Sequence, residues 1–118
     1  KVSEVFQENP IQTEFLWNDP YFIREKYREN IRGIGYMFNK RALDDFLRKT
    51  NLKIVIRAHQ DQTNGFDYAF GKNGGILTVF SSVNYCGQSN RGAFAIVSNY
   101  RGIELYQFAL EKKIFCTI

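Results

Sequence analysis

The sequence predicts an α/β domain of the α+β type, built mainly from antiparallel strands with one clear helix. Short runs rich in β-branched and aromatic residues recur along the chain, separated by glycine- and asparagine-rich turns. One segment alone has the apolar spacing of a helix. The 118 residues are enough for one modest core. So little helix cannot cover both faces of a sheet, which is typical of half of a layered α/β design.

The N-terminal third is expected to be mostly strand and loop. Glu14–Pro20 is predicted to be a strand that runs into a turn, because Pro20 keeps Asp19 out of the helical region. Tyr21–Asn30 is polar and aromatic, which favours a surface loop or an irregular helix. Arg32–Phe38 alternates in bulk and contains two glycines, which allow close approach of the backbone.

The predicted helix begins after Asn39, whose side chain is a good N-cap. Three apolar residues then fall on one helical face, and charged residues lie away from it. These apolar residues are Leu43, Phe46 and Leu47. The helix is expected to end near Thr50–Asn51, and its role is to carry the chain back to the sheet.

The next stretch combines a strand with the only histidine of the protein. Ile54–Ile56 is an apolar run of the kind found in strands covered on both faces. Arg57, His59 and Gln60 follow at once. A rigid strand that delivers an imidazole to a sheet edge suits a metal ligand or a catalytic base. The competing interpretation is a hydrogen-bonded histidine with a purely structural role.

The rest of the chain is expected to alternate strands and turns. Turns are predicted at residues 61–65, 71–75 and 99–102, and Ser81–Gly87 is expected to be a polar loop with an exposed tyrosine. The strands are predicted at Gly65–Phe70, Ile76–Phe80, Ala93–Val97, Ile103–Leu110 and, if the chain does not trail off, Ile114–Ile118.

Composition and charge narrow the possible functions. The formal charge is +4, and Arg24–Lys53 alone carries nine basic and four acidic residues. Such a region can attract nucleic acid, a phosphoprotein or an acidic partner, or it is a solvated helix face with its adjoining loop. Cys86 and Cys116 form no CxxC pair, and with His59 they are too few for a closed zinc site. No stretch suits a membrane span or a signal peptide, so we expect an intracellular protein, cytoplasmic or nuclear.

Four collinear stretches resemble the C-terminal half of the PPP-type protein serine/threonine phosphatase domain. The family writes them L-W-S-D-P, R-G-x-x-x-x-F-G, I-R-A-H-Q…G-Y and T-V-F-S-A-P-N-Y-C. In this sequence they are Leu16–Pro20, Arg32–Phe38, Ile56–Gln60 with Gly65–Phe66, and Leu77–Cys86. Departures include Ile31, Asn39 and Ser82–Val83; Ile31 and Ser89–Gly92 lean toward divergent branches such as the EF-hand-linked phosphatases.

The resemblance implies a β-sandwich flanked by helices, with a two-metal site of Mn, Fe or Zn. It implies that His59 is a metal ligand and that Arg32 holds the substrate phosphate. It places Tyr85 in the loop over the metals, with Cys86 beside it in a non-catalytic position. Asp19 is implied to be close to the catalytic site in a supporting role.

The resemblance covers only one portion of that domain. Residues 1–118 correspond to its C-terminal part, and the motifs that supply most metal ligands and the general acid lie upstream of Lys1. The implied partners are the N-terminal half, a phosphoprotein substrate and a regulatory subunit, and this segment alone is expected to be inactive. Two alternatives stay open: a non-catalytic phosphatase-like binding module, and a basic nucleic-acid-binding β-domain.

Overall fold

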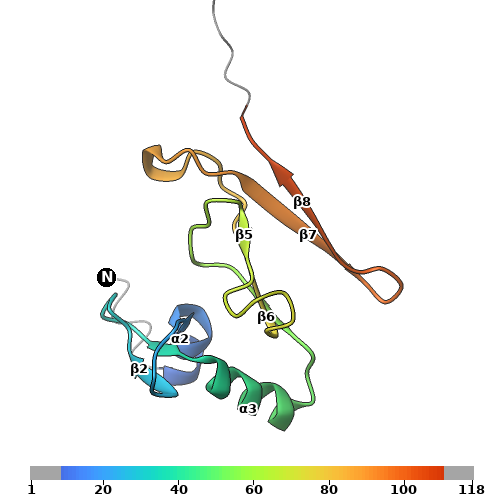
Figure 1. Cartoon of the computed structure of the whole chain (residues 1–118). Helices are drawn as coiled ribbons and strands as arrows, with labels where there is room; N and C mark the ends of the chain where they lie inside the picture. The colour runs from blue at the N-terminus through green and yellow to red at the C-terminus, as the bar shows by residue number, and fades with distance from the viewer. Residues whose placement is uncertain (1–8, 111–118) are drawn as a thin grey trace, which may run out of the picture. The chain divides into compact units, whose positions relative to one another are not determined.

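The structure is a computed structural model that describes residues 9–110. Its contacts fall into two compact units. The first takes in the chain up to His59 together with Tyr68–Leu77, and the second takes in Gln60–Asp67 and the chain from Thr78. Figure 1 follows the elements in chain order. Each unit is described by itself.

The first unit begins with helix α2, Pro10–Trp17. Asn9 caps it by accepting a hydrogen bond from the Gln12 N–H, and Pro10 occupies the first turn, where its missing N–H costs nothing. The predicted strand at Glu14–Pro20 is therefore wrong for its first part. Only Asp19–Pro20 is extended, as the short strand β1. The N-cap Asn9 and Pro10 favour a helix at this point, and their effect outweighs the strand-like aromatic and apolar residues that follow.

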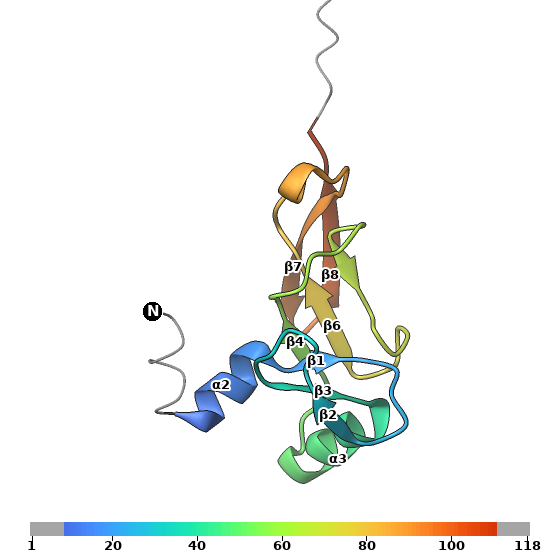
Figure 2. The same ribbon diagram turned by 90° about the vertical axis from the view of Figure 1, so that its left-hand side faces the viewer.

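Three short strands form the first sheet, in the order β1-β3-β2. β3 (Tyr36–Phe38) pairs in parallel with β1 and antiparallel with β2 (Tyr27–Glu29). The expectation of loop or irregular helix for Tyr21–Asn30 is thus corrected at its end. All three residues of β2 are exposed, so no buried alternation marks the strand in the sequence. Figure 2 shows the three strands together, with α3 next to β2.

Helix α3, Lys40–Thr50, confirms the predicted helix and its cap. The Asn39 side chain accepts a hydrogen bond from the Ala42 N–H, at 3.0 Å. The helix ends at Asn51, whose left-handed φ of 56° is typical of a C-cap asparagine. Ala42 and Leu43 are buried, whereas Phe46 stays more than one-third exposed. The core of the unit therefore lies under the N-terminal half of α3.

The second sheet has the order β4-β6-β5. β6 (Ile76–Val79) is buried as predicted, and the Ile76 and Leu77 side chains have no exposed surface. β4 (Val55–Arg57) is not covered on both faces, because Ile56 is 41% exposed. β5 is only Phe66–Asp67, shorter than the predicted Gly65–Phe70. Gly71 closes a turn by hydrogen bonding back to Tyr68, which ends the extended conformation early.

The second unit contains a long antiparallel hairpin. β7 (Gly92–Ser98) pairs with β8 (Gly102–Phe108), close to the predicted bounds (Figure 1). Before it lies the short 3-10 helix η1, Tyr85–Gly87, within the predicted polar loop. The predicted strand at Ile114–Ile118 lies outside the described residues.

The mixed fold class is confirmed, with strands predominating. The described residues hold two α-helices where one was predicted, and the β1–β3 pair is parallel. In the same residues, no helix has the length and apolar character needed to cross a bilayer.

We predict that Asn39→Ala destabilises α3 by about 1 kcal/mol, because its first turn loses a side-chain acceptor. Amide hydrogen exchange should show faster exchange at Ala42 and Leu43. Asn9→Ala is the control, since the α2 cap bond is long, 3.4 Å, and exposed. Equal protection of α3 before and after Asn39→Ala would contradict the prediction.

Candidate functional site

The buried carboxylate of Asp19 is the centre of the candidate site in the first unit. The residue is 3% exposed. Its Oδ1 accepts from Arg57 Nη2 at 2.8 Å. Its Oδ2 accepts from Arg32 Nε at 3.1 Å, from Arg32 Nη2 at 2.5 Å and from Asn30 Nδ2 at 2.8 Å. A buried carboxylate is tolerated only when it is paired and hydrogen-bonded in this way.

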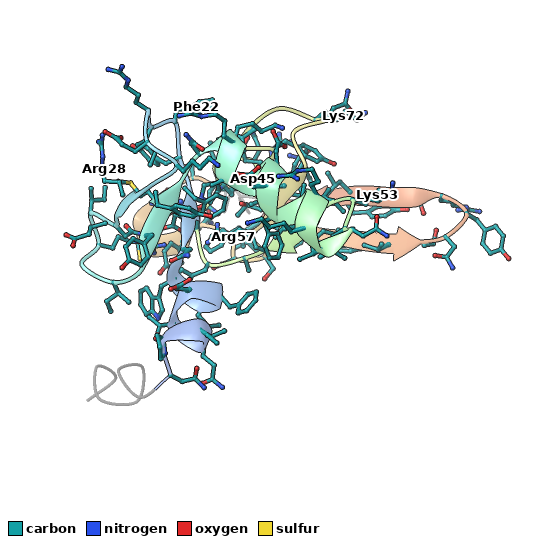
Figure 3. All side chains as sticks on the ribbon, turned by 90° about the horizontal axis from the view of Figure 1, so that it is seen from below. Phe22, Arg28, Asp45, Lys53, Arg57 and Lys72 are labelled. Atoms are coloured by element: carbon teal, nitrogen blue, oxygen red, sulfur yellow. The ribbon has the colours of Figure 1, made fainter. Side chains whose placement is uncertain are left out.

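Three separate segments bring these groups together. Asp19 is separated from the end of α2 only by the C-cap residue Asn18, so the end of that helix fixes the position of its backbone. Arg32 lies on the turn between β2 and β3, and Arg57 is the last residue of β4. Arg57 lies in the middle of the view in Figure 3. Arg57 also donates to the Asn18 carbonyl, so it binds both of the residues that follow α2, Asn18 and Asp19.

Arg57 is the more deeply buried of the two arginines. Its side chain is 13% exposed, against 36% for Arg32. Burial lowers the pKa of Arg57, while the charge and hydrogen bond of Asp19 act in the opposite direction. An arginine stays protonated in proteins despite such a shift, so Asp19 faces two positive charges. The buried Arg57–Asp19 pair stabilises the fold, and Arg32, the outer arginine, reaches the surface.

Arg32 presents only part of its guanidinium to Asp19. The carboxylate engages Nε and Nη2, which leaves the edge formed by Nη1 and Nη2 directed elsewhere. The guanidinium carbon lies 5.8 Å from the centroid of the Trp17 ring, a cation–π distance. The half-exposed fork is therefore held from two sides by this unit.

His59 lies two residues beyond the end of β4 and also contacts Trp17. Its ring meets Trp17 edge to face, with centroids 4.5 Å apart and an interplanar angle of 77°. Its φ of 78° is left-handed, which is uncommon for a residue other than glycine. Such strained residues cluster at functional sites. Trp17 thus contacts both Arg32 and His59, two of the residues that the sequence singles out.

The pKa of His59 is lowered. Loss of water around the ring is the largest cause, and the positive charge of Arg32 adds to it. Asp19 opposes the shift, and Arg57 reinforces it. A neutral imidazole is the form that binds a metal ion.

The described residues do not by themselves fit a two-metal site. Residues 9–110 hold no group of three or more His, Cys, Asp or Glu side chains that could bind a metal ion. Asp19 is committed to two arginines, so its oxygens are taken. His59 alone could supply only one of the ligands that a two-metal site needs.

Tyr85 belongs to the second unit and is 45% exposed, as the sequence predicted. The buried Asn90 organises its loop: Asn90 Oδ1 accepts from the Tyr85 N–H, and Nδ2 donates to the Ser82 carbonyl. Phe80 meets the Tyr85 ring edge to face at 5.2 Å. The following Cys86 is exposed and has a left-handed φ of 49°. The loop is a defined structure rather than an unstructured connection.

Sequence reasoning missed two members of the Asp19 cluster. The sequence pattern marks Arg57 only as a polar residue before His59, and it predicts a loop or an irregular helix at Asn30 with no role for its side chain. A signal for Asn30 exists in the glycines that follow it. Gly33 and Gly35 both have positive φ, and both form backbone hydrogen bonds with Asn30. Glycines at such spacing indicate a tight turn, and an asparagine at its start can accept a hydrogen bond from the backbone two residues on, as Asn30 does from the Arg32 N–H.

Comparisons with known proteins assign the chain to a family. The family model of the calcineurin-like phosphoesterases matches residues 2–62, which include Asp19, Arg32, Arg57 and His59. The chain belongs to the calcineurin-like phosphoesterase family.

Two relatives refine the assignment within this phosphoesterase family. The chain is 40% identical over 73 residues to the serine/threonine-protein phosphatase 4 catalytic subunit of Saccharomyces cerevisiae, which is 62% of this chain and 23% of that protein. A solved structure of a serine/threonine phosphatase from the same yeast, with similarity to human phosphatase PP5, matches with a TM-score of 0.66 and 26% identity. That match covers 81% of this chain and 33% of the other. The chain spans about a quarter of the length of the curated relative.

These findings confirm the predicted resemblance to the PPP-type protein serine/threonine phosphatases. They also confirm the mixed α/β fold class, because the chain matches part of a solved phosphatase structure. The individual roles of Asp19, Arg32, His59 and Tyr85 stay predictions.

We predict that His59 in the metal-free chain titrates below its ordinary pKa of 6.5. Arg32→Gln should raise the pKa of His59, because it removes a positive charge near the ring. The negative charge of Asp19, which favours the protonated ring, is then offset by one arginine fewer. The titration of the His59 ring protons by NMR measures both. Arg28→Gln, on the exposed strand β2, is the control. A pKa of His59 that does not move in Arg32→Gln would contradict the geometry.

The same shift fixes the pH dependence of stability. The folded chain resists protonation of His59, so the unfolded chain binds this proton first as the pH falls through 6.5. The contribution of His59 to stability is therefore lost below that pH and is constant above it. The free energy of unfolding, measured against urea at several pH values, should show this loss in the wild type and less of it in Arg32→Gln.

Proposed function

We propose that this chain supplies the phosphate-binding arginine and one metal-binding histidine of a protein serine/threonine phosphatase. The observation that carries the proposal is the arrangement around Trp17. One face of the cluster presents the half-exposed Arg32, anchored on the buried Asp19, and His59 contacts the same indole. An anion-binding fork and an imidazole held by one rigid group suit phosphate-ester hydrolysis.

Arg32 is proposed to hold the phosphoryl group. A guanidinium receives two anionic oxygens through one planar edge. Since Asp19 engages the Nε and Nη2 donors, the Nη1–Nη2 edge is the one for the substrate. In a transition state that spreads charge over the equatorial oxygens, such a fixed donor pair stabilises the charge without having to reorganise.

Asp19 is proposed to act through Arg32 and not on the substrate. Both its oxygens already accept hydrogen bonds from arginine. It therefore serves as a positioning residue, in keeping with the supporting role implied by its motif. Tyr85 is retained on the strength of its motif as the aromatic residue that contacts the bound phosphoester. Its exposed ring suits that role.

His59 is proposed to be one ligand of a two-metal centre of Mn, Fe or Zn. The remaining ligands are proposed to come from the N-terminal half of the phosphatase domain. When bound, such metals polarise the phosphoryl oxygens and supply a hydroxide nucleophile at neutral pH. The contribution of this chain is a neutral imidazole whose ring plane is fixed by Trp17.

The first unit has an exposed apolar surface that the proposed N-terminal half of the phosphatase domain would cover. A cavity of about 240 Å³ lies between α2 and α3. Its lining includes Phe15 from α2, Phe46 from α3 and Arg57 from β4. Phe15 is 76% exposed. Apolar side chains so exposed beside a cavity are typical of an interface. The proposed partners are this half-domain, a phosphoserine or phosphothreonine protein inside the cell and a regulatory subunit.

The nucleic-acid alternative finds less support. Most basic side chains of Arg24–Lys53 have local acceptors. Lys26 and Arg48 pair with Asp45, Arg28 pairs with Glu25, and Lys40 pairs with Asp44. Paired charges of this kind describe a solvated helix face more than a phosphate-tracking groove.

We predict that Arg32→Gln lowers kcat/KM for a small aryl phosphate about 100-fold, the usual loss for one preorganised donor. The assay uses this chain combined with an N-terminal half of a relative, with added Mn²⁺. His59→Ala should abolish activity together with part of the bound metal. Arg28→Gln is the matched control, since Arg28 pairs with Glu25 at 2.6 Å on exposed β2.

Two outcomes would count against the proposal. If Arg32→Gln behaves like Arg28→Gln, Arg32 does not hold the phosphate. If the combined protein binds no metal and hydrolyses nothing, while the chain still binds the N-terminal half, the non-catalytic binding module is the better description.

A further inference from the structure

Asn30 is a buried polar residue that no motif assigns. It is 6% exposed and lies between the end of β2 and the turn that carries Arg32. Its backbone N–H donates to the Gly35 carbonyl, and its own carbonyl accepts from the Gly33 N–H. These bonds close the turn 30–35 on itself. The backbone from which the asparagine side chain extends is therefore held in place within the turn that carries Arg32.

The amide of Asn30 contacts both partners of the Arg32–Asp19 ion pair. Its Nδ2 donates to Asp19 Oδ2 at 2.8 Å. Its Oδ1 accepts from the Arg32 backbone N–H at 3.0 Å. One side chain thus fixes the carboxylate and the main chain from which the guanidinium extends. Only an amide has a donor and an acceptor so placed at this length.

Asn30 also ties the pair to the tryptophan. The same Nδ2 donates to the Trp17 carbonyl at 3.2 Å. Gly35 allows this close approach, since a Cβ there would lie 2.8 Å from Asn18 Oδ1 and 3.1 Å from the Trp17 backbone. The turn therefore packs directly against the end of α2, where Asp19 begins.

The pair needs such a third group. Arg32 is long and its side chain is 36% exposed, so water competes for its donors and many rotamers are open to it. Arg57 fixes Oδ1 of the carboxylate, and Asn30 fixes Oδ2, the oxygen on which both Arg32 donors converge. Without the amide, rotation of the carboxylate would let the Arg32 fork swing.

We infer that Asn30 is a positioning residue that sets the direction of the outer Arg32 fork, and with it the affinity for the phosphoryl group. This inference rests on the proposed function of Arg32. It assigns Asn30 a role in substrate binding that it exerts wholly through Asp19 and Arg32.

Asn39 offers a matched control. It is an asparagine with the same 6% exposure, and it likewise bonds backbone through both ends of its amide. Its contacts are to Ile23, Arg24 and Ala42, and none is to Asp19 or Arg32. Loss of Asn39 thus tests general destabilisation of the same unit.

The first readout needs neither substrate nor metal. The hydrogen-exchange rate of the Arg32 Nε–H, followed by NMR in the full chain, reports how firmly Arg32 holds Asp19. Asn30→Ala should raise this rate about tenfold, the effect of weakening one charge-assisted bond. Asn39→Ala should leave it within about twofold. Equal rates in wild type and Asn30→Ala would overturn the inference.

Asn30→Asp is the second variant, for the case that alanine prevents folding. It keeps an oxygen for the Arg32 N–H but turns the 2.8 Å donor contact to Asp19 into one between two carboxylates. It should likewise speed exchange of the Arg32 Nε–H. An unchanged rate in this folded variant would overturn the inference.

Binding of inorganic phosphate by the same variants separates the two proposals. Arg32→Gln should remove the binding, Asn30→Ala should weaken it about tenfold, and Asn39→Ala should not alter it. If Arg32→Gln keeps full affinity, the proposed function of Arg32 fails. If Arg32→Gln loses binding while Asn30→Ala matches Asn39→Ala, only the role of Asn30 fails.

Discussion

The first unit depends on one constraint, that the Asp19 carboxylate is buried and must be neutralised where it lies. Removing one partner of a buried ion pair typically costs about 3–5 kcal/mol, because the remaining charge is left without compensation. Here two arginines and one amide share that task. The fold therefore determines the site, since β4 carries Arg57 and the turn after β2 carries Arg32. If either arginine moved, the buried carboxylate of Asp19 would lose an ion pair.

That constraint explains why short, weak elements give a defined site. β1 has two residues, and β2 and β3 have three each, so their ladders alone are marginal. The Asp19 cluster joins the α2 exit to points 11, 13 and 38 residues further along the chain. Each such contact closes a loop, and the entropy of closing it is recovered only when all the partners meet. The cluster and the small sheet therefore form together.

Local rules predicted the elements that local rules control. Asn39 predicts the start of α3 because an N-cap acts within one helical turn. The apolar composition of Ile76–Val79 likewise predicts a buried strand. α2 was misread because Asn9 and Pro10 outweigh the strand-like residues that follow them. β2 was missed because its exposed residues owe their conformation to the partner strand β3. Motifs marked Asp19, Arg32 and His59, but the part played by Asn30 arises from contacts that no local pattern contains.

The division of labour within one side chain explains why position 32 is an arginine. Nε and Nη2 hold Asp19, which leaves a second edge of the same plane for an anion. A lysine carries the same charge at a single point, so an ammonium that held Asp19 would have no second edge to offer an anion. The rigid guanidinium links the position of a buried carboxylate to the surface through its own plane. In the proposed phosphate site, the direction of Arg32 is therefore set by the buried carboxylate, and the residues that hold Asp19 belong to that proposed site as much as Arg32 does.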